Sequence, residues 1–179
     1  AVMAARAALK GPWGKATLEQ RVDALRRLAM LMQSRFSEIV AEEILDTGKP
    51  IAAVATNEIN RAIANLNAFA DIALSERIEP FRTQMANGAS AINETVRTPV
   101  GVIGIVAPWN LPLLLLTFKV APALACGNTI VVKPSEQTPR TAVLLAKLAL
   151  EAGIPAGVIN VVHGHGANAA GSFLTAHPG

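Results

Sequence analysis

Two short apolar segments, at residues 102–106 and 129–132, constrain the fold of this chain most strongly. Each segment runs into polar residues, and the apolar stretch between them, residues 112–126, is long enough for a crossover helix. Parallel strands joined in this way carry their ligands at their carboxyl ends. The pattern therefore predicts one parallel sheet, with Asn110, Lys133 and Glu136 gathered along the edge where both strands end.

The alternation of strand and helix continues beyond the second strand. A helix is predicted over residues 140–152, with Thr138 in its cap and Pro139 at its first position. A third strand over residues 158–162 precedes a last helix that runs toward His177. Because the complete two-half dinucleotide fold uses about six strands, we predict an α/β chain with an incomplete, Rossmann-like, doubly wound parallel sheet.

Helices and an extended excursion precede this sheet. A capping box that starts at Thr17 begins a helix whose apolar spacing continues to Ile44, and Gly48 ends it. A second helix is predicted over residues 51–74. Residues 79–97 are typical of a hairpin, and the pattern fits equally an ordinary surface hairpin and an arm that pairs with another subunit.

Composition excludes several classes of function. The 179 residues, 51% of them apolar, can bury a substantial core, and the net charge of +3 is small. No basic run is interleaved with aromatics, so nucleic-acid binding has little support. The single cysteine, Cys126, excludes an internal disulfide and a cysteine-based zinc cluster. No signal peptide is evident at the first residues, so we expect a cytoplasmic location.

The uncharged stretch at residues 98–118 is long enough to suggest a membrane span. Pro99, Gly104, Pro108 and Pro112 interrupt it, and a broken backbone exposed to lipid would leave polar groups unsatisfied. A buried parallel strand, a tight loop and the start of a buried helix explain the same stretch. We therefore expect no membrane partner.

Two of the strand-end residues have a functional and an ordinary explanation. The Asn110 side chain follows a buried strand, where an amide can donate to a developing oxyanion, or it can bond its own backbone as loop asparagines do. Glu136 occupies the position from which dinucleotide folds bind ribose hydroxyls, and its charge would repel a ribose phosphate. That favours NAD over NADP, unless Glu136 is simply a solvated residue ahead of the next helix.

Three reactive side chains, those of Cys126, His163 and His165, are predicted to have no catalytic or metal-binding role. Cys126 ends an apolar segment, which predicts a buried, structural thiol. His163 and His165 lack a third ligand, so no metal site is expected. Gly164 and Gly166 begin a glycine-rich turn, but the next glycine comes at position 171, too late for a dinucleotide fingerprint.

Several ordered motifs resemble the aldehyde dehydrogenase superfamily. They are Ala107-Pro108-Trp109-Asn110 and the stretches at residues 121–128 and 133–139, and residues 153–162 continue the match. The resemblance covers nearly all of the chain. It implies NAD-dependent oxidation of an aldehyde to a carboxylic acid, by a homodimer or homotetramer.

The resemblance also implies a role for particular residues. Asn110 would stabilise the tetrahedral thiohemiacetal, and Leu111, Leu115 and Phe118 would line the aldehyde tunnel. Residues 79–98 would form a strand excursion used in oligomer assembly. The cofactor would contact Val106, Ala107, Pro108, Trp109, Lys133, Ser135, Glu136, Gly166 and Gly171.

A narrower resemblance concerns the substrate. Residues 46–50, 60–62 and 110–117 resemble the hydroxymuconic and aminomuconic semialdehyde dehydrogenases, whose substrates carry a carboxylate remote from the aldehyde. A guanidinium suits a carboxylate, because it can bind both oxygens. One hypothesis is that Arg61 anchors this carboxylate, and the alternative is an ordinary exposed helix arginine.

The resemblance places the catalytic cysteine, the general-base glutamate and the pyrophosphate-binding turn beyond Gly179. Residues 1–179 are therefore expected to be the amino-terminal part of the NAD-binding domain, without a catalytic domain and inactive alone. Two alternatives are a nucleotide-binding module without turnover and an assembly piece whose sheet edge requires a partner.

Overall fold

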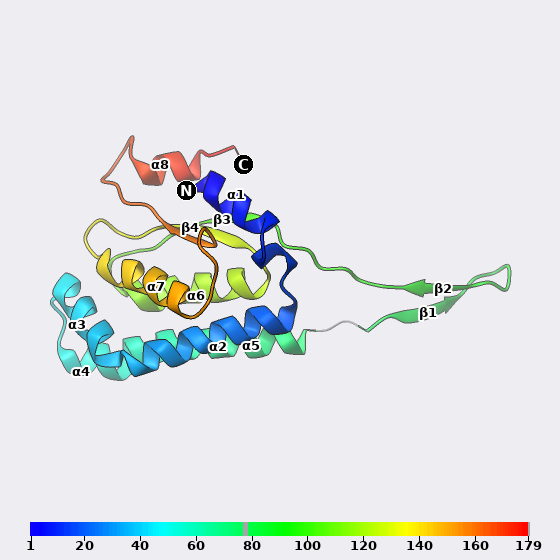
Figure 1. The fold of residues 1–179 in the computed structure, drawn as a ribbon, viewed down its shortest axis with the longest axis horizontal. Helices are drawn as coiled ribbons and strands as arrows, with labels where there is room; N and C mark the ends of the chain where they lie inside the picture. Colours follow the sequence, from blue (N-terminus) through cyan, green and yellow to red (C-terminus); the bar gives the residue numbers. More distant parts are fainter. Residues whose placement is uncertain (77–78, 179) are drawn as a thin grey trace.

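The computed structural model describes residues 1–76 and 79–178 as a layered α/β fold (Figure 1). The central sheet is parallel, in the order β3 (Val102–Val106), β4 (Thr129–Lys133) and β5 (Ile159–Val161). Helices α6 (Pro112–Ala125) and α7 (Arg140–Glu151) provide the two crossovers. The predicted α/β class and the parallel sheet are confirmed.

Helices cover both faces of this sheet, which explains its apolar strands. In Figure 1, α6 and α7 lie on one face, and α1 (Val2–Lys10) and α8 (Ala170–Thr175) lie on the other. Every residue of β4 is buried as a result. Parallel strands covered on two faces are expected to be continuously apolar. Over the described ranges, no helix combines the length and the apolarity needed to cross a bilayer.

The long helix predicted after Thr17 is in fact two helices. The predicted capping box is confirmed, since the Gln20 amide donates to Thr17 Oγ1 at 3.3 Å and the Thr17 amide donates to Gln20 Oε1 at 2.9 Å. However, α2 (Leu18–Ser34) stops at Arg35, and α3 (Phe36–Thr47) then begins. The Arg35 guanidinium pairs with Glu38 at 2.6 Å and with Glu151 at 3.0 Å. Apolar spacing alone does not show such a break, because both helices bury apolar faces.

The next helix contains an irregular stretch that the spacing did not predict. It consists of α4 (Ile51–Ala53), a π-helical stretch η2 (Val54–Ile59) and α5 (Asn60–Ser75). The π-helical stretch buries Glu58 beside two apolar side chains. π-Helical turns occur frequently at functional sites.

The hairpin predicted before the sheet is confirmed as an exposed excursion. Strands β1 (Phe81–Gln84) and β2 (Ser90–Asn93) pair antiparallel and project away from the helices (Figure 1). Phe81 and Ile92 are 61% and 67% exposed, so the arm presents apolar side chains to its surroundings.

Helix α3 caps both crossover helices. Asp46 Oδ2 accepts the Arg140 amide at the start of α7, at 2.8 Å. Glu43 is fully buried, and its two carboxylate oxygens accept the Leu113 amide of α6 at 3.2 Å and the Thr141 hydroxyl of α7 at 2.6 Å. Carboxylates at helix N-termini are favourable, because they bind unpaired N–H groups and face the positive end of the helix dipole.

This arrangement corrects the predicted cap of α7. Pro139 is the cap residue rather than the first helical residue. The Thr138 hydroxyl is buried and has no hydrogen-bond partner among the residues described. The side chain that accepts the first free amide of α7 is that of Asp46. It lies 94 positions before Arg140, so a local sequence pattern could not reveal it.

We predict that two substitutions at the start of α7 affect the free energy of unfolding differently. Asp46→Ala should lower the free energy of unfolding by about 1 kcal/mol, because the Arg140 amide loses its acceptor. Thr138→Val should leave it unchanged or raise it, because the hydroxyl it removes makes no hydrogen bond. Urea denaturation of both variants measures the difference, and a loss for Thr138→Val as large as that for Asp46→Ala would contradict the assignment.

Glu43 should make stability depend on pH. Burial raises the pKa of its carboxyl above 4.5, although the hydrogen bonds from Thr141 and Leu113 oppose the rise. A raised folded-state pKa means that stability is greatest below the unfolded pKa and falls as pH rises through the folded one. Glu43→Gln cannot ionise, so its stability should gain on the wild type as pH rises from below the ordinary carboxyl pKa through the raised folded-state pKa. Urea titrations across this range test it, and a constant difference would refute it.

Candidate active site

The carboxyl ends of β3 and β4 lie side by side. Val106 is the register partner of Lys133, and the Ala107 amide donates to the Lys133 carbonyl at 3.1 Å. The loop to Asn110 and the loop to Glu136 therefore start from the same level of the sheet. This is the edge at which parallel sheets bind ligands.

A basic and an acidic side chain meet at the end of β4. The buried Lys133 ammonium lies 2.7 Å from Glu136 Oε2, and Glu136 itself is exposed. The hydrogen bond from Lys133 holds the pKa of the Glu136 carboxyl below its ordinary value, so the group is ionised at neutral pH. An exposed carboxylate of this kind can accept hydrogen bonds from the hydroxyl groups of a ribose.

The glycine-rich turn after β5 lies against the same pair. A β-carbon at Gly171, in the first turn of α8, would lie 3.8 Å from Lys133 Cε. A β-carbon at Gly164 would lie only 2.8 Å from the Ala170 nitrogen, so this close approach requires glycine. Gly166 has φ of 59°. The structure therefore brings Gly171 to Lys133, and it shows that Gly164 is the glycine that permits the turn.

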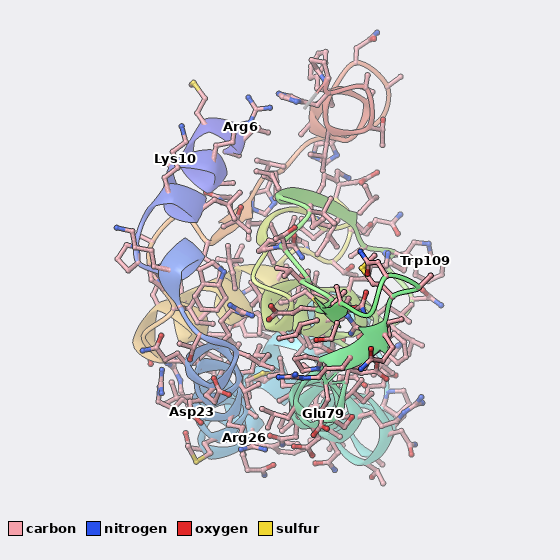
Figure 2. The ribbon with its side chains drawn as sticks, turned by 90° about the vertical axis from the view of Figure 1, so that its right-hand side faces the viewer. Arg6, Lys10, Asp23, Arg26, Glu79 and Trp109 are labelled. Atoms are coloured by element: carbon pink, nitrogen blue, oxygen red, sulfur yellow. The ribbon has the colours of Figure 1, made fainter. Side chains whose placement is uncertain are left out.

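The remaining predicted cofactor residues belong to the two loops. Ser135 Oγ accepts the Gln137 amide at 3.2 Å and so stabilises the turn after β4. Val106 and Trp109 are 46% and 60% exposed, and Trp109 lies at the periphery of the side chains in Figure 2. Ala107 is buried, while Pro108 is exposed. Together these residues leave the surface beside β3 open to a ligand.

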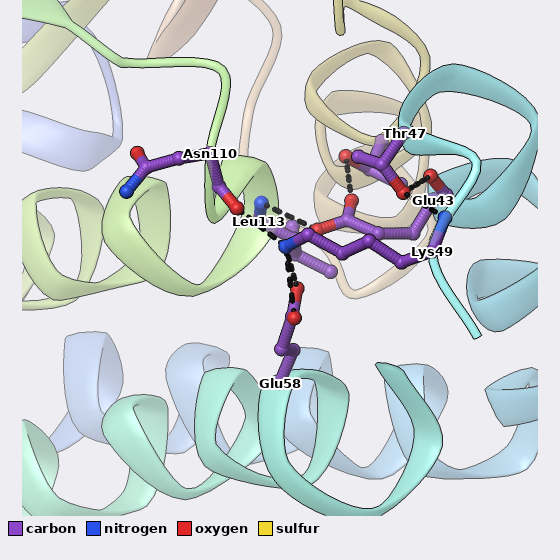
Figure 3. Close-up of polar contacts among 7 residues, drawn as sticks. Glu43, Thr47, Lys49, Glu58, Asn110 and Leu113 are labelled. Atoms are coloured by element: carbon purple, nitrogen blue, oxygen red, sulfur yellow. Dashed lines mark hydrogen bonds and ion pairs between the residues drawn. The ribbon is translucent and has the colours of Figure 1, made fainter. Parts of the chain in front are cut away.

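The Asn110 side chain is exposed and points away from the contacts of its own backbone (Figure 3). The Asn110 carbonyl accepts a hydrogen bond from the Lys49 ammonium. No residue in the described ranges makes a hydrogen bond to the Asn110 carboxamide. The amide group is thus available as a donor, while its backbone is held.

Helices α5 and α6 align the residues predicted to contact the substrate. Asn65 Nδ2 donates to the Leu114 carbonyl at 3.3 Å, and the rings of Phe69 and Phe118 pack edge to face at 5.4 Å. Arg61 is exposed, lies one turn before Asn65 and shares its helix face. On α6, the half-buried Leu115 lies one turn after the half-buried Leu111. The residues predicted to contact the substrate therefore lie along α5 and α6, at increasing distance from Asn110 on α6.

The prediction of a buried Cys126 is wrong. Cys126 is exposed, because α6 ends at Ala125 and the cysteine lies in the turn that follows. Helix α6 has 14 residues, so Cys126 lies roughly 20 Å from Asn110, at the opposite end of the helix. This distance separates the thiol from the candidate site.

Sequence reasoning missed three charged residues near Asn110. Lys49 belongs to the helix-ending stretch and to the 46–50 motif without a role of its own, and Glu43 and Glu58 stand only within predicted helices. In the structure the Lys49 ammonium contacts Glu58 as well as the Asn110 carbonyl, and Glu43 lies beside them (Figure 3). The signal that could have identified Glu43 and Glu58 is a charged residue at a helix position that is buried. Within the described ranges, no three His, Cys, Asp or Glu side chains gather as metal ligands.

Comparisons with known proteins agree with this architecture. The family model described as "Aldehyde dehydrogenase family" matches residues 1–179. The chain is 54% identical over 178 residues to a 2-hydroxymuconic semialdehyde dehydrogenase of Pseudomonas sp. (strain CF600), a match that covers 99% of this chain and 37% of that protein. It is 53% identical to a 2-aminomuconic 6-semialdehyde dehydrogenase of Pseudomonas sp., with 99% and 36% covered.

A solved structure gives the same result in three dimensions. The structure of an aldehyde dehydrogenase from Bacillus cereus with NAD+ superimposes with a TM-score of 0.87 at 37% identity, and the match covers 98% of this chain and 35% of that one. The chain thus spans little more than a third of the relatives it matches. It belongs to the aldehyde dehydrogenase family.

Proposed function

We propose that this chain is the amino-terminal part of the cofactor-binding domain of an NAD-dependent enzyme that oxidises an aldehyde to a carboxylic acid. The observation that carries the proposal is the common edge of β3 and β4, where Asn110 and the Lys133–Glu136 pair follow adjacent strand ends. Membership of the family supports it, and so does the likeness to an enzyme solved with NAD+.

The residues at the end of β4 fit NAD. The ionised Glu136 carboxylate would accept hydrogen bonds from the adenosine ribose, and Lys133 would orient it through their 2.7 Å contact. A phosphate on that ribose would meet the same negative charge and be repelled. Gly171 has no side chain and Val106 is exposed, so both positions leave room for the rest of the ligand. When bound, NAD supplies the hydride acceptor.

Asn110 would act on the substrate. Attack of a thiolate on the aldehyde carbon forms a tetrahedral thiohemiacetal, whose oxygen carries negative charge. The Asn110 carboxamide, to which no residue of the described ranges hydrogen-bonds, would donate to that oxygen. Because Cys126 lies at the far end of α6, we propose that the nucleophile comes from a residue outside the given sequence.

We propose a muconic-type semialdehyde as the substrate. Relatives with 54% and 53% identity are named for such substrates. Arg61 is exposed and makes no ion pair with any residue of the described ranges, so its guanidinium is available to bind a remote carboxylate on both oxygens.

The exposed hairpin is the proposed assembly arm. Its two strands leave backbone edges unpaired, and its apolar side chains are exposed. Pairing with a second copy would cover both, in a homodimer or homotetramer.

The first test is turnover in the full-length protein. Asn110→Ala should lower kcat with NAD and an aldehyde by about 100- to 1000-fold, because the oxyanion loses one donor, while the Kd for NAD stays unchanged. Production of reduced cofactor measures the rate, and Asn67→Ala, which removes an exposed asparagine of α5, is the matched control. NAD binding without turnover in the wild type would instead identify a nucleotide-binding module.

A second test concerns Arg61. Arg61→Ala should raise KM for a semialdehyde that carries a remote carboxylate by about tenfold, which corresponds to the loss of a charged hydrogen bond. An aldehyde of similar length without the carboxylate is the control, and its KM should not change. Equal KM values for the diacid semialdehyde in wild type and variant would rule out the anchor.

A further inference from the structure

Three segments of the chain converge on the ammonium group of Lys49. Lys49 lies between α3 and α4, and its Nζ contacts both carboxylate oxygens of Glu58, at 2.8 and 2.9 Å. The same ammonium donates to the Asn110 carbonyl, 61 positions later in the chain (Figure 3). One cation therefore links the π-helical stretch to the loop that carries the proposed oxyanion donor.

A second contact holds the same loop from its other side. The Leu113 amide donates to the buried Glu43 carboxylate at 3.2 Å. Thr47 connects the two contacts, because its hydroxyl donates to the Glu43 carbonyl at 2.7 Å and accepts the Lys49 amide at 3.5 Å. The backbone is thus held at Asn110 and at Leu113, on both sides of Leu111 and Pro112.

The stability of α6 does not explain why the Lys49 ammonium lies beside the start of that helix. A cation beside the first turn of α6 has the wrong sign for the helix dipole, which favours anions at that end. Buried ion pairs are often no more stabilising than apolar residues of the same size, because both charges lose their hydration. The Glu58 side chain is 9% exposed, so its desolvation is nearly complete.

We propose that Lys49 is a positioning residue: held in place by Glu58, it fixes the Asn110 carbonyl and so aims the Asn110 carboxamide at the oxyanion. The inference deepens the proposed aldehyde oxidation and rests on it. The π-helical stretch has a role in this scheme, because it places the Glu58 carboxylate at the Lys49 ammonium.

The test is a double-mutant cycle in the full-length protein. Lys49→Met alone would leave Glu58 buried and unpaired, so the variant to make is Lys49→Met with Glu58→Met, which removes both charges. Its kcat should fall by about 10- to 100-fold, the loss that a misplaced catalytic group causes, with the KM for the aldehyde and the Kd for NAD within about twofold of wild type. In an Asn110→Ala background the same two substitutions should cause no further fall, because Lys49 would act only through that side chain.

A readout without turnover separates this inference from the proposed function. Hydrogen exchange of the segment 107–115 should accelerate in the Lys49→Met, Glu58→Met variant. It should not accelerate when Arg26→Gln with Asp71→Asn removes the exposed ion pair between α2 and α5. An equal fall in kcat with and without Asn110, or unchanged exchange, would overturn the positioning role. A wild type that oxidises no aldehyde would refute the proposed function, while exchange would still decide whether Lys49 holds the loop.

Discussion

The buried carboxylate of Glu43 joins the parts of the molecule on which the rest depends. Its oxygens bind the first turns of α6 and α7, the two helices that connect the strands of the sheet. The loops that precede these helices are the two strand-end loops of the candidate site. The buried carboxyl group is accommodated because both of its oxygens accept hydrogen bonds at the starts of the two helices, although burial still raises its pKa. Together with Asp46, Glu43 makes α3 the element that sets where both loops lie.

The sheet and its ligand edge could be predicted because their signals are local. Continuous apolar strands, the crossover segment and the polar residues after each strand all lie within short windows of sequence. The capping box at Thr17 and the left-handed Gly48 are local in the same sense. The pairing of Lys133 with Glu136 spans only three positions, so the cofactor half of the candidate site was also accessible.

The other half of the candidate site depends on contacts between distant positions. The groups that hold the Asn110 loop lie 61 and 70 positions before their partners, and no window of sequence contains both ends. The π-helical stretch was missed because its apolar residues fit an α-helical spacing. The break at Arg35 is a departure of one residue from helical backbone angles (φ −106°, ψ 25°), which periodicity does not record. Cys126 was misjudged because its burial depended on where α6 ends, and helix ends are the least certain part of a pattern.

The caps on α6 and α7 also set an order of assembly. Glu43 and Asp46 of α3 precede the amides that they accept, in α6 and α7, by 70 and 94 positions. During synthesis a chain emerges from its amino terminus, so α3 is complete before the first residue of either crossover helix appears. The crossover helices therefore depend for their N-terminal caps on a segment that is synthesised before them.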